Sequence, residues 1–208
     1  MLPGIDVSYA QGSIAWGVVA RSGASLVKWV ISRVSYGARP ADNDGPIFND
    51  NHDECQKFGI PFGAYHFFLF SDDPKAQADL FLGAANGRYG SIRPTVDVEE
   101  GSGTLGSVEA NVAALTAFND EIRKELGCDP IIYTNADTWD GRMGGTDAFS
   151  GHSLWVANYP ATAGRPAMPK GWTDWAIHQY SDKGQPPGIK GYVDLDVVHS
   201  DSLDGLLR

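Results

Sequence analysis

The chain has 208 residues, of which 42% are hydrophobic and 20% are charged, a balance that excludes a disordered or fibrous protein. No apolar run approaches the roughly 18 residues that a membrane-spanning helix needs, so no membrane partner is expected. The formal net charge of −10 comes without a basic patch, which argues against a nucleic-acid partner. The length fits one large domain, and we expect it to span residues 1–208.

Short apolar runs rich in β-branched and aromatic residues recur along the chain and predict eight β-strands. They cover residues 4–8, 29–35, 62–68, 94–99, 131–134, 154–159, 175–180 and 192–197. Helical patterns follow each of the first five strands, at residues 14–22, 47–58, 73–86, 107–126 and 135–142. Asp73 and Pro74 form a helix-start signal, and Gly127 follows the fourth helix as its C-terminal cap.

Five strand–helix units followed by three strands joined through Gly/Pro-rich loops predict an α/β fold with a parallel sheet. Eight strands favour a closed (β/α)-barrel whose last part lacks helices. The alternative is an open, doubly wound sheet with a β appendage. No internal repeat or linker marks a second domain.

Carboxylates fall near the expected carboxyl ends of three strands, where parallel barrels carry their catalytic groups. Asp6 lies on the first strand, Asp97 and Glu99 on the fourth, and Asp194 and Asp196 on the eighth. Because side chains alternate along a strand, Asp97 and Glu99 should point the same way. Crowded carboxylates repel one another, so at least one pKa should rise and leave a neutral acid beside an ionised one. Cleavage of a glycosidic bond needs one neutral and one ionised carboxyl group. A metal site or a solvated strand end is the alternative interpretation of the Asp-x-Glu motif.

Aromatic residues near the strand ends favour a sugar substrate, because their faces pack against pyranose rings. Histidines and cysteines show no metal-binding spacing, no CxxC occurs, and residues 42–45 (DNDG) lack the ligand spacing of an EF-hand, so we interpret them as a solvated turn. We therefore expect no metal, no cofactor and two free thiols. For both tryptophans, core and cleft positions stay open. The aromatic residues are Tyr65, Tyr133, Tyr159, Tyr180, Trp155 and Trp175.

Motifs along the whole chain, in matching order, resemble glycoside hydrolase family 25, the Chalaropsis-type lysozymes. They are residues 4–12 (GIDVSYAQG), Phe48 and Asn51 with residues 59–67 (GIPFGAYHF), residues 97–99 (DVE), 132–134, 154–157, 175–180 and 188–196. The resemblance implies a flattened TIM-like (β/α)5(β)3 barrel in a single domain. It also implies an enzyme that hydrolyses the β-1,4 bond between N-acetylmuramic acid and N-acetylglucosamine in peptidoglycan.

By motif position, the resemblance makes Glu99 the acid/base and Asp97 its assistant, which positions the substrate's 2-acetamido group. Asp6 and Asp194 complete an acidic floor, with Asp196 as the alternative to Asp194. Glu100 should point away from the mouth and carry no role. The residues expected to bind the glycan are Tyr65, Phe67, Tyr133, Trp155, Gln179 and Tyr180.

The opening residues, MLPGIDVSYAQG, lack the basic and apolar regions of a signal peptide. This favours a phage endolysin released by a holin or a bacterial lysis enzyme, and a secreted lysozyme without its leader is the alternative. We expect a monomer that acts on cell-wall glycan strands, with retention through attack by the acetamido group. The competing hypotheses are a non-catalytic glycan-binding barrel and a metal-dependent hydrolase.

Overall fold

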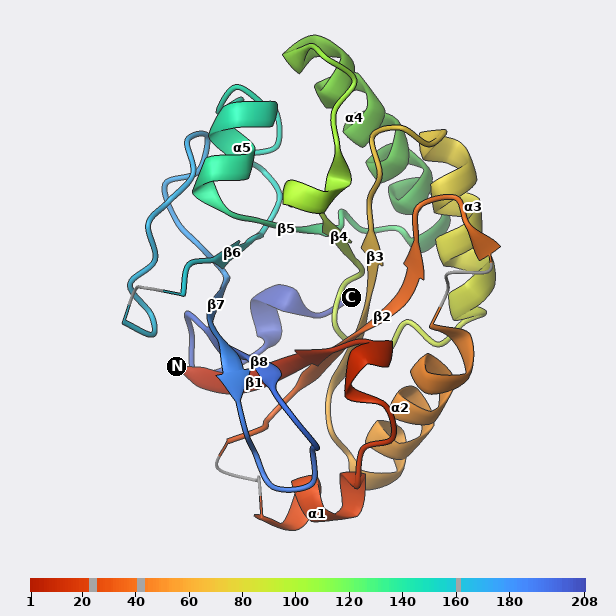
Figure 1. Cartoon of the computed structure of the whole chain (residues 1–208), viewed down its shortest axis with the longest axis vertical. Helices are drawn as coiled ribbons and strands as arrows, with labels where there is room; N and C mark the ends of the chain where they lie inside the picture. Colours follow the sequence, from red (N-terminus) through yellow and green to blue (C-terminus); the bar gives the residue numbers. More distant parts are fainter. Residues whose placement is uncertain (23–25, 41–43, 160–161) are drawn as a thin grey trace.

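Eight strands close into a barrel in the order β1-β2-β3-β4-β5-β6-β7-β8 in the computed structural model (Figure 1). The structure describes residues 1–22, 26–40, 44–159 and 162–208. Residues 42 and 43 of the DNDG segment therefore lie outside the described residues. The closed barrel confirms the predicted (β/α)5(β)3 architecture in a single domain, and the open-sheet alternative is wrong.

Each predicted strand is present, most of them within two residues of the expected bounds. The strands are β1 (Leu2–Val7), β2 (Val30–Tyr36), β3 (Phe62–Phe67), β4 (Thr95–Asp97), β5 (Ile131–Thr134), β6 (Leu154–Ala157), β7 (Ile177–Gly184) and β8 (Val193–Val198). β4 is shorter than expected because the chain turns into a 3-10 helix directly after Glu99.

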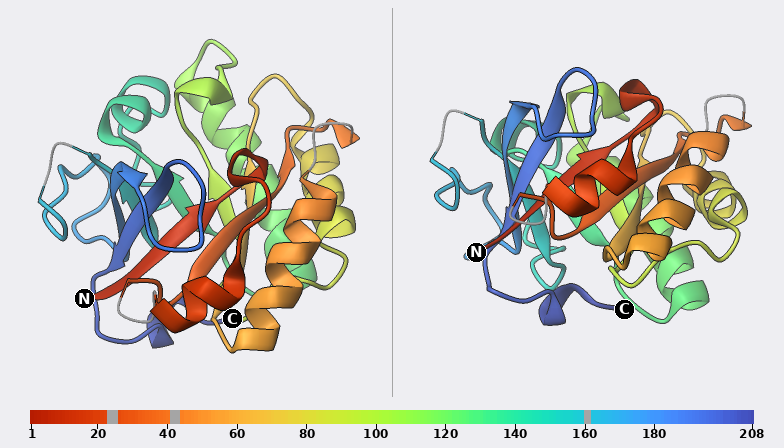
Figure 2. Two further views of the ribbon diagram at one scale, coloured as in Figure 1. Left: turned by 60° about the horizontal axis from the view of Figure 1, so that its bottom comes forward. Right: turned by 90° about the horizontal axis from the view of Figure 1, so that it is seen from below.

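The five predicted helices are also present, and they cover one side of the barrel while loops cover the β6–β8 side (Figures 1 and 2). They are α1 (Trp16–Ser22), α2 (Gly45–Phe58), α3 (Pro74–Ala85), α4 (Val108–Leu126) and α5 (Ala136–Arg142), with 3-10 helices η1 (Tyr9–Gln11), η3 (Glu100–Ser102) and η4 (Asp204–Leu206). Asp73 caps α3 by accepting the Ala76 amide, and Gly127 ends α4 in a left-handed conformation with φ 71°. Among the described helices, none is long and apolar enough to cross a membrane.

The direction of β8 differs from a uniformly parallel barrel. β1 to β7 pair in parallel, whereas β8 pairs antiparallel with both β7 and β1. The expectation that the β8 acids sit at the carboxyl end of their strand is therefore wrong. The loop of residues 185–192 returns the chain without a crossover helix, so β8 starts at the mouth, where Asp194 pairs directly with Asp6.

Apolar side chains form two layers, one between strands and helices and one inside the barrel. The inner layer places Trp155 under the mouth, while Leu203 and Leu206 close the opposite end. Trp155 is thus both a core residue and the floor of the cleft. Trp175 precedes β7 at the opposite end, where its ring stacks on His199 at 4.4 Å, so Trp175 does not belong to the cleft.

Candidate active site

The mouth of the barrel holds a cavity of about 160 Å³, hereafter the acidic cavity. Asp6 comes from β1, and Asp97 comes from β4. Glu99 directly precedes η3, and Asp194 lies at the start of the reversed β8. The structure thus brings the four predicted catalytic side chains together. The lining residues are Asp6, Arg33, Tyr65, Phe67, Asp97, Glu99, Tyr133, Trp155, Tyr159, Gln179 and Asp194.

A second cavity of about 720 Å³, the outer cavity, adjoins the first towards α5. Both cavities are lined by Glu99, Tyr133 and Tyr159, so Glu99 stands where they meet. Glu100 lines the outer cavity but not the acidic cavity at the mouth. Strand alternation ends before Glu99, because the chain enters η3 and the turn swings Glu100 towards β5. An open groove with an acid at its centre suits a chain-like substrate.

Burial is the main cause of the raised pKa values of Asp97 and Glu99. The charge of Glu99 raises the pKa of Asp97 further, and Glu100 does the same for Glu99. Among the described residues, Asp97 Oδ1 is buried without a hydrogen-bond partner. Because an unpaired buried carboxylate oxygen is costly, the Asp97 carboxyl, which lines the acidic cavity, would gain from a hydrogen bond donated by a ligand N–H or O–H there.

Of the two acids on β8, Asp194 lines the acidic cavity and Asp196 does not. Burial, followed by the charges of Asp182 and Glu99, raises the pKa of Asp194 to about 6. Asp196 is fully buried, where it accepts the Trp155 Nε1–H at 2.9 Å. Burial first, then the neighbouring acids, raises the pKa of Asp196. The interaction of Asp196 with the Asp6 carboxyl also raises the pKa of Asp196 and partly offsets the effect of burial on the pKa of Asp6.

Replacing Asp196 by asparagine should stabilise the fold at about pH 7, by on the order of 1–2 kcal/mol. A carboxyl whose folded pKa is raised favours folding below its unfolded pKa and loses that contribution as pH rises through the folded value. An asparagine at this position can still accept the Trp155 Nε1–H and donate its amide to Asp6. Unlike the aspartate, it takes up no proton when the chain folds. The gain should vanish near pH 4. Thermal unfolding at both pH values measures it, and a Tm difference independent of pH would contradict it.

One amide side chain organises the polar wall of the cavity. Gln179 Nε2 donates to Asp6 Oδ2 at 2.7 Å, which leaves Gln179 Oε1 as an acceptor. The hydroxyls of Tyr133 and Tyr159 both donate to this Oε1, at 2.7 and 2.8 Å. The two tyrosine oxygens are therefore free to accept hydrogen bonds from a bound ligand.

Of the other residues expected to bind the glycan, Tyr65, Phe67 and Trp155 line the acidic cavity. Tyr180 lines neither cavity, because it lies on the other face of β7 from Gln179 and its ring packs against His178. The structure therefore does not bring Tyr180 together with the other residues expected to bind the glycan.

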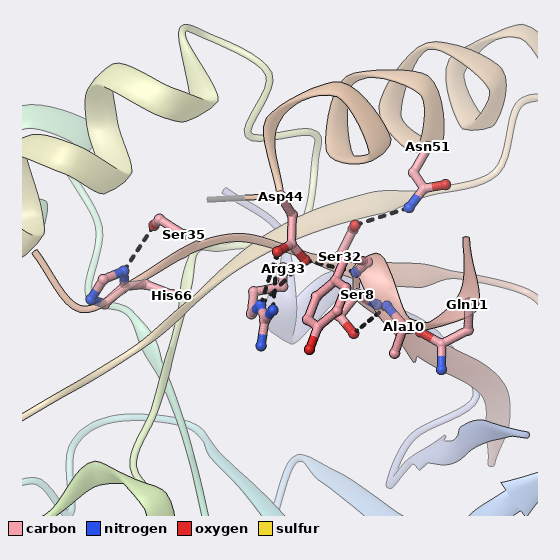
Figure 3. A network of polar contacts seen from close by, with 10 residues as sticks. Ser8, Ala10, Gln11, Ser32, Arg33, Ser35, Asp44, Asn51 and His66 are labelled. Atoms are coloured by element: carbon pink, nitrogen blue, oxygen red, sulfur yellow. Dashed lines mark hydrogen bonds and ion pairs between the residues drawn. The ribbon is translucent and has the colours of Figure 1, made fainter. Parts of the chain in front are cut away.

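Arg33 on β2 is a cavity residue that the sequence analysis missed. Its guanidinium pairs with Asp44 (Figure 3), Nη2 to Oδ1, at 3.0 Å. The guanidinium also lies 4.9 Å from the centre of the Tyr9 ring. Asp44 is only 4% exposed, so its interpretation as part of a solvated turn is wrong. The Arg33 charge lowers the pKa of both Asp97 and Glu99, against the effect of burial. A single charged residue, an arginine, inside an otherwise uncharged strand was the available signal.

The two histidines on strands do not reach the acidic cavity. His66 is buried between Ser35 Oγ (2.8 Å) and Gln77 Oε1 (3.1 Å), and burial lowers its pKa to about 4 (Figure 3). Since the Leu69 amide also donates to Gln77 Oε1, His66 Nε2 must carry a proton, and the ring is a neutral structural group. Within the described part of the chain, no group of three or more His, Cys, Asp or Glu could hold a metal ion.

A barrel whose mouth combines paired carboxyls of raised pKa with an aromatic-lined groove suits the chemistry of a glycoside hydrolase. The family model for Glycosyl hydrolases family 25 matches residues 5–189, and the chain belongs to this family. It is therefore a glycoside hydrolase, and the predicted family membership is confirmed.

Individual relatives agree with this assignment. Lysozyme M1 of Streptomyces globisporus is 32% identical over 92% of this chain and 65% of its own length. The solved bacterial lysozyme of Streptomyces coelicolor is 27% identical, with a TM-score of 0.85 over 99% of this chain and 94% of the other. The catalytic domain of endolysin ply40 from bacteriophage P40 of Listeria monocytogenes is 25% identical, with a TM-score of 0.79 over 99% and 97%.

Proposed function

We propose that this chain is a lysozyme that cleaves the β-1,4 bond between N-acetylmuramic acid and N-acetylglucosamine in bacterial peptidoglycan. The observation that carries the proposal is the position of Glu99, with its raised pKa, where the acidic and outer cavities meet. Relatives named lysozyme and endolysin support the substrate. We propose residues 1–208 as one catalytic domain, because β8 and η4 complete the barrel beyond the family match.

In this proposal, Glu99 protonates the leaving glycosidic oxygen while the substrate's acetamido oxygen attacks the anomeric carbon. The Asp97 carboxylate, which lines the acidic cavity, accepts the acetamido N–H and stabilises the positive charge that develops there. In the second step, water attacks the anomeric carbon, the acetamido group is released, and the Glu99 carboxylate takes the water proton. Two inversions at one carbon give net retention.

The remaining cavity residues have supporting roles in this scheme. Asp6 and Asp194 form the acidic floor, which favours the positively charged, oxocarbenium-like transition state. Tyr65, Phe67 and Trp155 pack against the sugar. The wall of Tyr133 and Tyr159, oriented by Gln179, accepts hydrogen bonds from it. Tyr180 is not proposed as a contact.

The most direct test digests purified peptidoglycan and identifies the new reducing-end sugar. Muramic acid ends support a muramidase, whereas glucosamine ends or free stem peptides would overturn the assignment. A barrel that binds glycan without releasing any reducing ends would instead be the non-catalytic alternative. Activity that is lost in EDTA and restored by a divalent cation would favour the metal-dependent hydrolase.

We further propose that the enzyme acts as a monomer on the bacterial cell wall and belongs to a phage lysis system. The endolysin relative supports this origin. Cells that express the chain in the cytoplasm should stay intact until their membrane is permeabilised, and should then lyse. Lysis without permeabilisation would contradict holin-dependent release, and a dimer in sedimentation would contradict the monomer.

Activity should fall as pH rises through the pKa of Glu99, because the acid then loses its proton. Glu100 raises this pKa by repulsion, so Glu100→Gln should move the alkaline limb to lower pH and leave the rate at acidic pH within about 3-fold. Glu125→Gln, at the far end of α4, is the control. The measurement is kcat/KM against pH on a soluble glycan. A wild-type rate that climbs to pH 9, or a limb unmoved in Glu100→Gln, would refute this prediction.

A further inference from the structure

Arg142, the last residue of α5, contacts the backbone of the segment that carries Glu99. Its Nη1 donates to the carbonyl oxygen of Glu99 at 2.6 Å and to that of Glu100 at 2.5 Å. Both carbonyls belong to the turn that leads from β4 into η3. A charge-assisted bond from a guanidinium is stronger than a neutral one, so these contacts hold the turn firmly.

Backbone hydrogen bonds hold both ends of the turn, because the Phe68 amide donates to the Asp97 carbonyl and the Phe70 amide to the Ser102 carbonyl, both at 2.9 Å. Ser102 supplies the two local hydrogen bonds, since its amide donates to the Glu99 carbonyl and its Oγ accepts from the Glu99 amide, both at 3.0 Å. The Val98 amide donates to the carbonyl of Tyr133 at 2.9 Å, which ties the turn to β5. Arg142 adds the contact that connects Glu99 and Glu100 to a helix.

The backbone of Arg142 is itself held by a hydrogen bond from α4. Asn111 on α4, which is 1% exposed, donates from Nδ2 to the Arg142 carbonyl at 2.9 Å and to Thr104 Oγ1 at 3.0 Å. Asn111 Oδ1 accepts the Leu105 amide at 2.8 Å. The segment from Glu99 to Leu105 is thus tied to α4 and α5, with Arg142 at its catalytic end. A cation at a helix C-terminus is also favoured by the helix dipole.

The charge of Arg142 acts on the Glu99 carboxyl as well. Burial and Glu100 raise the pKa of Glu99, while Arg33 and Arg142 lower it from opposite sides of the groove. Removing the Arg142 charge should therefore raise this pKa. The groups that share the electrostatic environment of Glu99 are Asp6, Arg33, Asp97, Glu100, Tyr133, Arg142, Tyr159 and Asp194.

We propose that Arg142 is a positioning residue: it clamps the carbonyls of Glu99 and Glu100 so that the Glu99 side chain projects into the junction of the two cavities. The inference rests on the proposed role of Glu99 as the acid. Arg142 lines the groove beyond the outer cavity, together with Glu100, and acts through the turn rather than on the scissile bond.

The test compares Arg142→Gln, which removes the charge, with Arg142→Lys, which keeps it, and with the distant control Arg88→Gln. On a soluble glycan, Arg142→Gln should lower kcat by about 10-fold with KM within about 3-fold, because the acid is misplaced while the binding groove is kept. Its alkaline limb should move to higher pH, since Glu99 then holds its proton longer. Arg142→Lys should leave the limb in place and recover part of kcat, and Arg88→Gln should match the wild type.

Arg142→Ala supplies a second measurement. Millimolar methylguanidinium should restore part of its kcat and should not affect Arg88→Gln. Equal kcat losses in the Lys and Gln variants, with both limbs unmoved and no rescue, would show a merely structural contact and overturn the proposal. An unchanged kcat in folded Arg142→Gln would do the same.

A readout that does not depend on turnover separates this inference from the proposed function. Titration of the Glu99 carboxyl by carbon NMR should show a higher pKa in Arg142→Gln than in the wild type. If Glu99→Gln stays active, the role of Glu99 is wrong even where this shift is seen. If Glu99→Gln is inactive but neither the shift nor the kcat loss occurs, only the role of Arg142 fails.

Discussion

Replacing Glu99 by glutamine is expected to lower the rate of glycan cleavage by about 10²–10⁴-fold, the usual cost of losing a general acid. Glutamine has the same shape but cannot give a proton to the leaving oxygen. Glu99 is part-buried and its side chain has no salt-bridge partner among the described residues, so the barrel should stay folded. Release of reducing ends measures the rate, and circular dichroism checks the fold.

Glu125→Gln is the matched control for this substitution, because Glu125 lies at the exposed C-terminal end of α4. It should retain the wild-type rate. A folded Glu99→Gln enzyme that keeps more than about a tenth of the activity would show that another group is the acid.

Asp97→Asn is expected to lower kcat by about 10²–10³-fold, the usual cost of losing one preorganised charge-stabilising group. Asparagine can still accept the acetamido N–H through its oxygen, but it cannot stabilise the positive charge of the cyclic intermediate. The loss should therefore fall on kcat, with KM within about 3-fold. Asp6→Asn and Asp194→Asn should lose less, because these acids contribute to the floor rather than to the attacking group.

The result for Asp97 depends on the substrate, which gives a second check. A glycan whose cleaved muramic residue lacks its acetyl group should react slowly with the wild type, and Asp97→Asn should cost little more on it. If the wild type cleaves this glycan as fast as the acetylated one, the acetamido group is not the nucleophile and the role proposed for Asp97 fails.

The sequence was sufficient for the order of elements and for the convergence of four acids. The positions of Asp6, Asp97 and Glu99 near strand ends predicted that they meet at the barrel mouth, whereas core and cleft positions stayed open for Trp155. The barrel closure that pairs Asp6 with Asp194 followed from the number of strands. The reversal of β8 did not, because a loop without a helix leaves the strand direction open.

Local periodicity failed where strands end or where partners are distant in sequence. Glu100 lies in a 3-10 turn, so strand alternation does not give its position, and Tyr180 lies on the outer face of β7. Arg33 and Asp44 form a part-buried pair that only the folded barrel creates. Arg142 reaches Glu99 across 43 residues. The spacing of residues in the sequence does not predict such long-range contacts.

The acid cluster runs against the rule that buried charges should be paired, which is expected at a functional site. Burial raises the pKa of Asp6, Asp97 and Asp196 above their ordinary values, so part of the cluster stays neutral at the cost of stability. Asp196 does not line the acidic cavity, and its burial together with the neighbouring acids raises its pKa. The stabilisation expected for Asp196→Asn follows from this arrangement.

Proton NMR of a peptidoglycan digest, recorded before the anomers equilibrate, tests the central claim most directly. The anomeric signal identifies both the sugar at the new reducing end and its first-formed configuration. The proposed mechanism predicts N-acetylmuramic acid ends in the β configuration, because acetamido attack and hydrolysis each invert the same carbon. First-formed α ends would contradict acetamido participation, and N-acetylglucosamine ends would contradict the muramidase assignment itself.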